Sequence, residues 1–227
     1  MSGDSMLDKA RKIHKLSEFK KFMRGERGLT DEDFSAPIDS ISQDVISSNS
    51  ENALKIFHEV FEKQADRWTA TRRLPVHNMW HHFIVPAAIL TAVRNQGGPI
   101  DDEDITEAID RGRQFPGGSC GFMGTCGGAY SVGIVGSIIS GVTPVHGGDR
   151  SRLMRTVSET LARISEIETR CCKRSSYIAM QEACRYLQDF DSLLPEEIVC
   201  HYWKENHLCA GAECPFHPQA CNQKDDE

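Results

Sequence analysis

The sequence predicts an all-α fold, because apolar residues recur at helical spacing in several segments and no segment alternates apolar and polar residues over a sustained length. The chain has 227 residues, of which 39% are hydrophobic, so one domain can bury a substantial core. It also contains nine cysteines and nine histidines. We expect a compact helical domain with a buried glycine-rich loop and helix and an irregular cysteine-rich knuckle at its C-terminus.

The composition divides the chain into three parts. Residues 1–50 are charged and then Ser-rich, and we expect a fraying helical extension over 1–28 and a linker or loosely docked segment over 29–50. Residues 51–221 form the predicted helical domain, and residues 222–227 form a polar tail.

Charge and missing motifs argue against several classes of protein. The net charge is −7 and the aromatic content is 7%, so we expect no nucleic-acid binding. The charge-free segment 116–145 is too rich in Gly, Ser and Thr for a membrane span of about 20 apolar residues. Phosphate-loop, dinucleotide-binding, zinc-protease and serine-hydrolase motifs are absent. The N-terminus lacks the apolar part of a secretory signal, so we expect a reducing, cytoplasmic location.

The first three helices of the domain are predicted from their spacing and their ends. Ser50 is a candidate N-cap for the first helix. Its inward face carries Leu54, Phe57, Phe61 and Trp68. The second helix covers residues 76–95, and Pro86 either restarts or kinks it. Residues 101–112 form a short third helix with acidic residues in its first turn.

The remaining helices lie within and after the charge-free segment. We expect a buried helix over residues 126–141, where small residues let neighbouring helices approach closely. Residues 149–169 form the clearest amphipathic helix. Its apolar face carries Leu153, Val157, Leu161 and Ile164. Ser175 is a candidate N-cap for the last predicted helix.

The glycine-rich loop PGGSCGFMGTCGG carries the first candidate metal ligands, Cys120 and Cys126. Cys126 is expected to open a helix, whose N-terminus favours the thiolate form. Glycines around both cysteines let backbone amides approach a bound cofactor. These candidate contacts are Gly118, Gly121, Gly124 and Gly127. The alternative is a tight buried turn in which the small residues only pack.

The sequence RCCKR, residues 170–174, lies at the junction of two predicted helices. Its cations favour thiolates at Cys171 and Cys172, which are further candidate metal ligands. Arg170 and Lys173 are candidates to contact a cofactor, either by binding an anion or by offsetting the charge of a thiolate-bound cluster. The alternative for these cations is ordinary electrostatic capping of a helix C-terminus.

The C-terminal cysteines Cys200, Cys209 and Cys214 form the third group of candidate ligands. So short a segment with so little apolar content needs a staple to be ordered. Zinc takes four such ligands, and a [4Fe–4S] cluster takes up to four thiolates. The spacing matches neither the usual zinc pattern nor the ferredoxin pattern, so the identity of the metal stays open.

Three histidines, His77, His81 and His82, lie within six residues. On a helix, His77 and His81 share one face and can chelate a metal or place an acid beside a base. We expect His81 or His82 to donate a proton at a catalytic site that includes Cys126. The alternative is a structural role for these histidines in the core.

Four motifs in the same order resemble one uncharacterised family of cysteine-rich domains from anaerobic archaea and bacteria: HHFIVPAAIL, PGGSCGFMGTCGG, RCCKR and C-x4-CPF. The resemblance covers roughly residues 70–218. It implies a cytosolic domain with an iron–sulfur or thiol-redox role, sometimes found beside or fused to a methyltransferase-like domain. An electron donor or a methyltransferase-like protein is therefore the expected partner.

Two functions from different classes remain. In the first, the loop cysteines and the RCCKR cysteines converge on one site that holds an iron–sulfur cluster, most simply [4Fe–4S]. The protein would then be an oxidoreductase or a sulfur-transfer enzyme. In the second, a zinc ion staples the C-terminal segment of a non-catalytic module that binds a partner protein. We favour the first function, because a zinc staple leaves the other four cysteines without a role.

Overall fold

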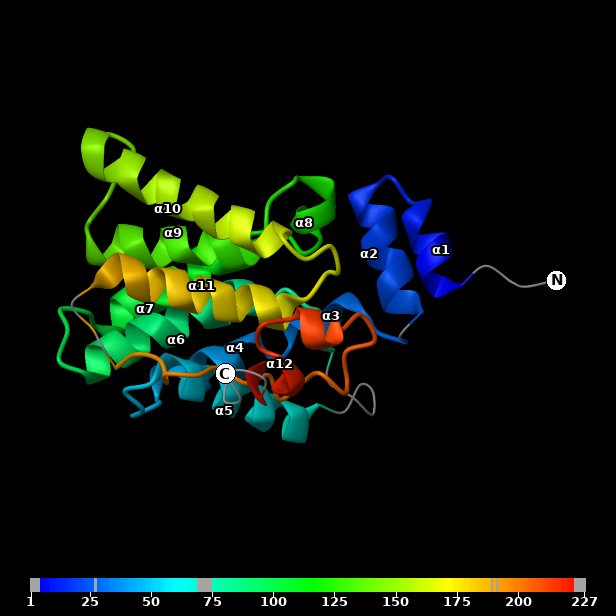
Figure 1. The fold of residues 1–227 in the computed structure, drawn as a ribbon, viewed down its shortest axis with the longest axis horizontal. Coiled ribbons are helices and arrows are strands. Elements are labelled where there is room, and N and C mark those ends of the chain that lie inside the picture. The colour runs from blue at the N-terminus through cyan, green and yellow to red at the C-terminus, as the bar shows by residue number, and fades with distance from the viewer. Residues whose placement is uncertain (1–4, 27, 69–74, 189, 191, 223–227) are drawn as a thin grey trace.

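The computed structural model describes residues 5–26, 28–68, 75–188, 190 and 192–222, so all but the first residue of the predicted polar tail lies outside the described residues. The fold is all-α as predicted, and the described residues contain no strand. Figure 1 shows α10 and α9 stacked over α11, α6 and α7, with α4 and α5 on the opposite side. The helices are α1 (Met6–Arg11), α2 (Leu16–Gly25), α3 (Asp31–Ser35), α4 (Ile38–Ile46), α5 (Ala53–Arg67), α6 (His81–Asn95), α7 (Asp102–Gln114), α8 (Ser119–Phe122), α9 (Gly127–Ile139), α10 (Gly147–Ser165), α11 (Cys172–Leu187), the 3-10 helix η1 (Gly211–Glu213) and α12 (Pro218–Asn222).

Helix α6 forms the centre of the molecule. Each of its residues from His81 to Val93 is buried, and it packs against α4, α5, α7, α9 and α11. Pro86 lies inside this helix and does not interrupt it. Because proline has no backbone N–H, it cannot bond the carbonyl of His82, and the hydroxyl of Ser131 on α9 donates to that oxygen over 3.3 Å. The neighbouring helix therefore satisfies the carbonyl that proline leaves free.

The helix starts follow local capping, in part at other residues than predicted. Asp101 caps α7 with a reciprocal capping box, in agreement with its acidic first turn. Asn52 rather than Ser50 caps α5. Cys171 rather than Ser175 caps α11, because its sulfur accepts the backbone N–H of Arg174 over 3.3 Å. A sulfur atom thus replaces the usual oxygen at this helix start.

The prediction of a linker or loosely docked segment over residues 29–50 is wrong. Helix α4 lies in this segment and buries Ile38, Ile41 and Val45 in the core, while Arg67 of α5 donates to the carboxylate of Asp44 over 2.5 Å. The serines and acids between these residues lowered the average hydropathy and hid their helical spacing. The packed body therefore includes α4.

The N-terminal hairpin, α1 and α2, has fewer contacts with this body. Helix α2 has no buried residue, and its Phe19 ring lies 5.3 Å from the Phe122 ring of α8. Figure 1 shows the hairpin to one side of the stacked helices. None of the described helices is long and apolar enough to cross a membrane.

Candidate functional site

Seven cysteines line two neighbouring cavities. The larger one, which we call the loop cavity, has a volume of about 730 Å³. Its cysteines are Cys120, Cys126, Cys171 and Cys172. The smaller one, which we call the C-terminal cavity, has a volume of about 10 Å³. Its cysteines are Cys171, Cys200, Cys209 and Cys214. Cys171 lines both cavities, and none of the nine cysteines forms a disulfide.

The wall of the loop cavity is built by the glycine-rich loop, His82 of α6, the second half of α10 and the start of α11. All four predicted glycines line it: Gly118, Gly121, Gly124 and Gly127. Gly118 and Gly124 have φ values of +92° and +61°, which strain any residue with a side chain. A Cβ on Gly127 would lie 2.0 Å from Cδ2 of His82, so this glycine lets the loop approach α6.

Cys126 precedes α9 as its N-cap residue, as predicted. Burial raises the pKa of the Cys126 thiol, because desolvation of a thiolate outweighs the lowering effect of Gly128 and Ser175. Burial therefore opposes the preference for the thiolate that the helix start predicts.

Arg170 lies among the sulfurs of the loop cavity. Its Nη2 is 3.9 Å from the sulfur of Cys172, and its Nε is buried without a hydrogen-bond partner. Burial lowers the pKa of this guanidinium, but Cys172, Cys120 and Cys126 together raise it, and the net shift is upward. The side chain therefore keeps its positive charge beside three cysteines, and one of its N–H groups remains available to a bound group.

His82 lines the loop cavity, but not as the predicted proton donor. Its Nδ1 lies 3.0 Å from the carbonyl oxygen of Phe115, and since a carbonyl only accepts, Nδ1 carries the proton. Burial lowers the pKa of His82 to about 4, so the ring is neutral at physiological pH. Its Nε2 is therefore an acceptor, which suits a base better than an acid.

His81 and His77 do not share a helix face, contrary to the prediction. Helix α6 begins at His81, and His77 precedes it and bonds Oδ1 of Asn206 over 2.9 Å. His81 lines neither cysteine cavity, and its Nδ1 lies 3.0 Å from Oδ1 of Asn78. Burial lowers the pKa of His81 well below its usual value. This histidine has the structural role that was the alternative.

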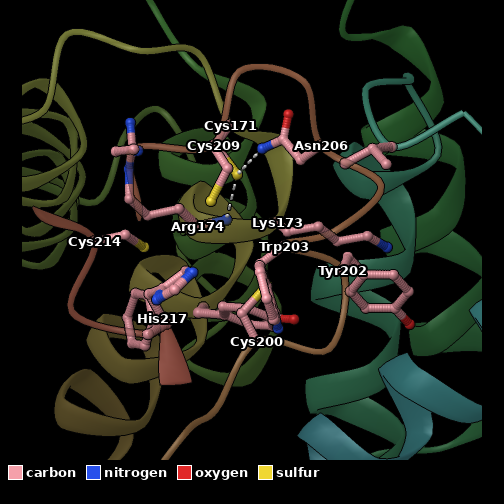
Figure 2. A pocket seen from close by; sticks show the side chains of 14 residues that line it. Cys171, Lys173, Arg174, Cys200, Tyr202, Trp203, Asn206, Cys209, Cys214 and His217 are labelled. Carbon is pink, nitrogen blue, oxygen red and sulfur yellow. Dashed lines mark hydrogen bonds between the residues drawn. The ribbon is translucent and has the colours of Figure 1, made fainter. Parts of the chain in front are cut away.

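Hydrogen-bond donors point at the sulfurs of the C-terminal cavity (Figure 2). Cys171 accepts the N–H of Arg174 over 3.3 Å and the amide of Asn206 over 3.5 Å. Cys209 accepts the N–H of Gly211 over 3.4 Å. Cys200 and Cys214 line the same cavity. Sulfurs on two distant parts of the chain therefore face a single space.

The pKa of Cys171 is raised on balance, although the Arg174 cation of the RCCKR motif acts to lower it. Burial raises the pKa of this thiol to about 11, which outweighs the Arg174 N–H and the Arg174 charge. The guanidinium of Arg174 donates instead to the carbonyl oxygens of Ile167 and Thr169. These contacts hold the chain that leads into α11.

Lys173 lines the C-terminal cavity and not the loop cavity, so it and Arg170 do not serve one site. Its Nζ is buried without a hydrogen-bond partner, 2.8 Å from the ring centroid of Phe61 and 4.0 Å from that of Tyr202. Burial lowers the pKa of Lys173 well below its usual value, while Cys172, Cys200 and Cys171 act in the opposite direction. Ionised sulfurs would therefore help to keep this amine charged.

Within the described ranges, no three His, Cys, Asp or Glu side chains lie close enough together to hold a metal ion as they stand. The sulfurs of either cavity therefore need to move inward to share one ion.

Two residues at the cavities were not predicted as site residues. Ser175 was interpreted as a helix cap, but it lies inside α11 and lines the loop cavity. Asn206 joins His77 to Cys171, and no spacing in the sequence indicates that contact.

A family model described as a family of unknown function (DUF5714) matches residues 41–217. The matched range contains all seven cysteines of the two cavities and begins inside α4. No curated protein matches the chain, and no solved structure does.

Proposed function

Because this chain belongs to the DUF5714 family, whose function is unknown, we propose a function from its own side chains: it binds an iron–sulfur cluster in the loop cavity and uses it in redox or sulfur chemistry. The observation that carries the proposal is that Cys120, Cys126 and Cys172 come from three different elements and line one cavity of about 730 Å³. Arg170 lies in the same cavity.

The ligand set suits a cluster better than a single ion. Three thiolates hold three irons of a [4Fe–4S] cluster and leave the fourth iron open to a substrate. Burial keeps Cys126 protonated in the absence of metal, which makes it a poor free nucleophile, whereas a metal displaces the thiol proton.

The surrounding side chains have separate roles in this proposal. The guanidinium of Arg170 offsets the negative charge of the thiolates, and its unpaired Nε–H donates to the bound group. Ser175 and the loop glycines line the same cavity and would tune the reduction potential by donating hydrogen bonds to the bound thiolates. The neutral ring of His82 accepts a proton at the cavity wall. When bound, the cluster supplies electrons one at a time or an iron position for a substrate.

An oxidoreductase or a sulfur-transfer enzyme is the class of activity that we propose. Redox chemistry at a cluster needs an electron donor, so we propose an electron-donor protein as the partner, with a methyltransferase-like protein as the alternative that the family resemblance implies. We propose the cytoplasm as the compartment, since nine cysteines without a disulfide suit a reducing environment.

The test measures iron, acid-labile sulfide and visible absorption in protein purified without oxygen and reconstituted with iron and sulfide. We expect about four irons per chain in the wild type. Cys126→Ser should lose the iron and the visible absorption while its far-UV spectrum stays the same. Cys184→Ser is the matched control, because Cys184 lies on α11 and lines neither cavity. Equal iron in Cys126→Ser and wild type would refute the proposal.

A further inference from the structure

We infer that the protein has a second metal centre, a structural zinc ion held by Cys171, Cys200, Cys209 and Cys214 in the C-terminal cavity. Cys171 is the N-cap of α11, and the other three cysteines lie in the C-terminal segment, residues 192–222. Figure 2 shows the four side chains around one space between that segment and the start of α11. This centre is separate from the proposed cluster and does not depend on it.

The size of the cavity indicates a single ion. Its volume of about 10 Å³ corresponds to one water-sized sphere, whereas the loop cavity is large enough for a cluster. Four thiolates complete the tetrahedral coordination of zinc and leave no position for substrate, which is typical of structural sites. Zinc–sulfur bonds are about 2.3 Å long. Binding would therefore draw the four sulfurs inward from their present positions.

The hydrogen bonds around these sulfurs suit thiolates better than thiols. N–H groups donate to two of the four cysteines: the backbone of Arg174 and the side-chain amide of Asn206 to Cys171, and the backbone of Gly211 to Cys209. A neutral thiol is a weak hydrogen-bond acceptor, and a hydrogen bond to a charged thiolate is stronger. Donors already directed at the sulfurs would stabilise metal-bound thiolates without rearrangement of the backbone.

Lys173 provides an independent observation. Lys173 is 1% exposed, its amine has no hydrogen-bond partner, and it lines the same cavity as the four sulfurs. A buried amine without a counter-charge is costly. Zinc with four thiolates carries a net charge of −2, which supplies the counter-charge that the aromatic rings around Lys173 provide only in part.

The centre would attach the C-terminal segment to the helical body. Apart from η1 and α12, the described part of this segment is irregular, and it reaches the core through side chains such as Ile198 and Phe216. A metal that joins it to α11 contributes its binding free energy to folding. The ion would therefore order the segment that covers Tyr177 and Lys173.

The test measures zinc by mass spectrometry in the full-length protein and in variants. Wild type should hold about one zinc per chain, and Cys209→Ser should lose it. Cys209→His, which offers a nitrogen ligand, should recover zinc, and this control separates ligation from a failure to fold. Wild type reconstituted with Co²⁺ should show the visible bands of tetrahedral cobalt thiolate.

Two further variants distinguish this inference from the proposed cluster. Cys184→Ser and Cys120→Ser should both keep zinc, while Cys120→Ser alone should lose iron. If Cys209→Ser kept its zinc, or if the wild type bound neither zinc nor Co²⁺, the second centre would be overturned. Loss of iron instead of zinc from Cys209→Ser would also overturn it, because the cluster would then occupy the C-terminal cavity.

Discussion

At the scale of single residues, burial decides which groups are charged around the two cavities. It raises the pKa of the Cys126 and Cys171 thiols and lowers that of the His82 imidazole, so all three are neutral at pH 7 without a metal. Arg170 beside them stays charged, because a guanidinium is not deprotonated in proteins. A bound metal would reverse the state of the cysteines by displacing their protons. The chemistry of both cavities therefore depends on what occupies them.

Two other buried histidines predict an acid-sensitive fold. Burial, followed by the charges of His201 and Lys173, lowers the pKa of His58 to about 3, and burial lowers that of His81 well below 6.5. Between pH 6.5 and about 4, the unfolded chain binds protons at these positions and the folded chain does not. The free energy of unfolding should therefore fall as the pH falls, by at most about 1.4 kcal/mol per pH unit for each histidine.

Urea denaturation at several pH values from 7 to 4.5 measures this dependence. His58→Gln should reduce the slope, because it removes one of the three histidines, with His81 and His82, that bind a proton in the unfolded chain but not in the folded chain. A stability that does not change between pH 7 and 5 would contradict the assignment of His58 and His81 as neutral buried side chains.

At the scale of elements, α6 and α7 pack at the carbonyl group of His82, which lacks its usual helical hydrogen bond because the partner residue is Pro86. A Cβ on Gly112 of α7 would lie 2.4 Å from the carbonyl oxygen of His82 and 2.6 Å from the Cα of Phe83. These are backbone atoms inside a fully buried helix, so they have no room to move. The close approach of α7 to α6 therefore requires glycine at this position.

Gly112→Ala should destabilise the protein by about 2 kcal/mol, within the usual cost of overpacking. Alanine has a helix propensity up to about 1 kcal/mol more favourable than that of glycine. The expected destabilisation already includes this favourable contribution. Chemical denaturation measures the difference. Gly147→Ala is the matched control, because no atom lies within 4 Å of its added Cβ, and it should be neutral or slightly stabilising. Equal stability of the two variants would contradict the packing argument.

The same elements show how much the sequence predicts. The centres of α5, α7 and α9 agree with their predicted helices because spacing and end residues both mark them. Helix α4 was missed because its three core residues are separated by serines and acids. The three groups of cysteines were found by composition, but their division between two cavities depends on tertiary packing. No local pattern shows that Cys171 lines both of them.

At the scale of the whole molecule, the first turn of α11 connects the two proposed centres. Cys172 lies in the loop cavity and interacts with Cys126, while Cys171 interacts with Cys200 in the C-terminal cavity. The α11 helix also packs against α5, α6, α9 and α10. The two proposed centres would therefore share a single helical turn, in a part of the chain that the family model covers.

The N-terminal hairpin, α1 and α2, contributes least to the two cavities and to the helices packed around them. A cavity of about 880 Å³ lies between α1 and α2 on one side and residues such as Val76 and Leu208 on the other. The family match begins only at residue 41. We therefore predict that a chain starting at Leu29 keeps the free energy of unfolding of the full protein to within about 1 kcal/mol, since few side chains lose burial.

A chain starting at Ser47 should behave differently, because it also lacks α4. That truncation removes Phe34, Ile38, Ile41 and Val45 from the core, at about 1.5 to 3 kcal/mol for each side chain. The loss is comparable with the total stability of a typical domain, about 5–15 kcal/mol, so this chain should be largely unfolded. Urea denaturation and far-UV spectra of both truncations measure the difference. If the chain starting at Leu29 were unfolded too, the hairpin would have to be part of the packed body.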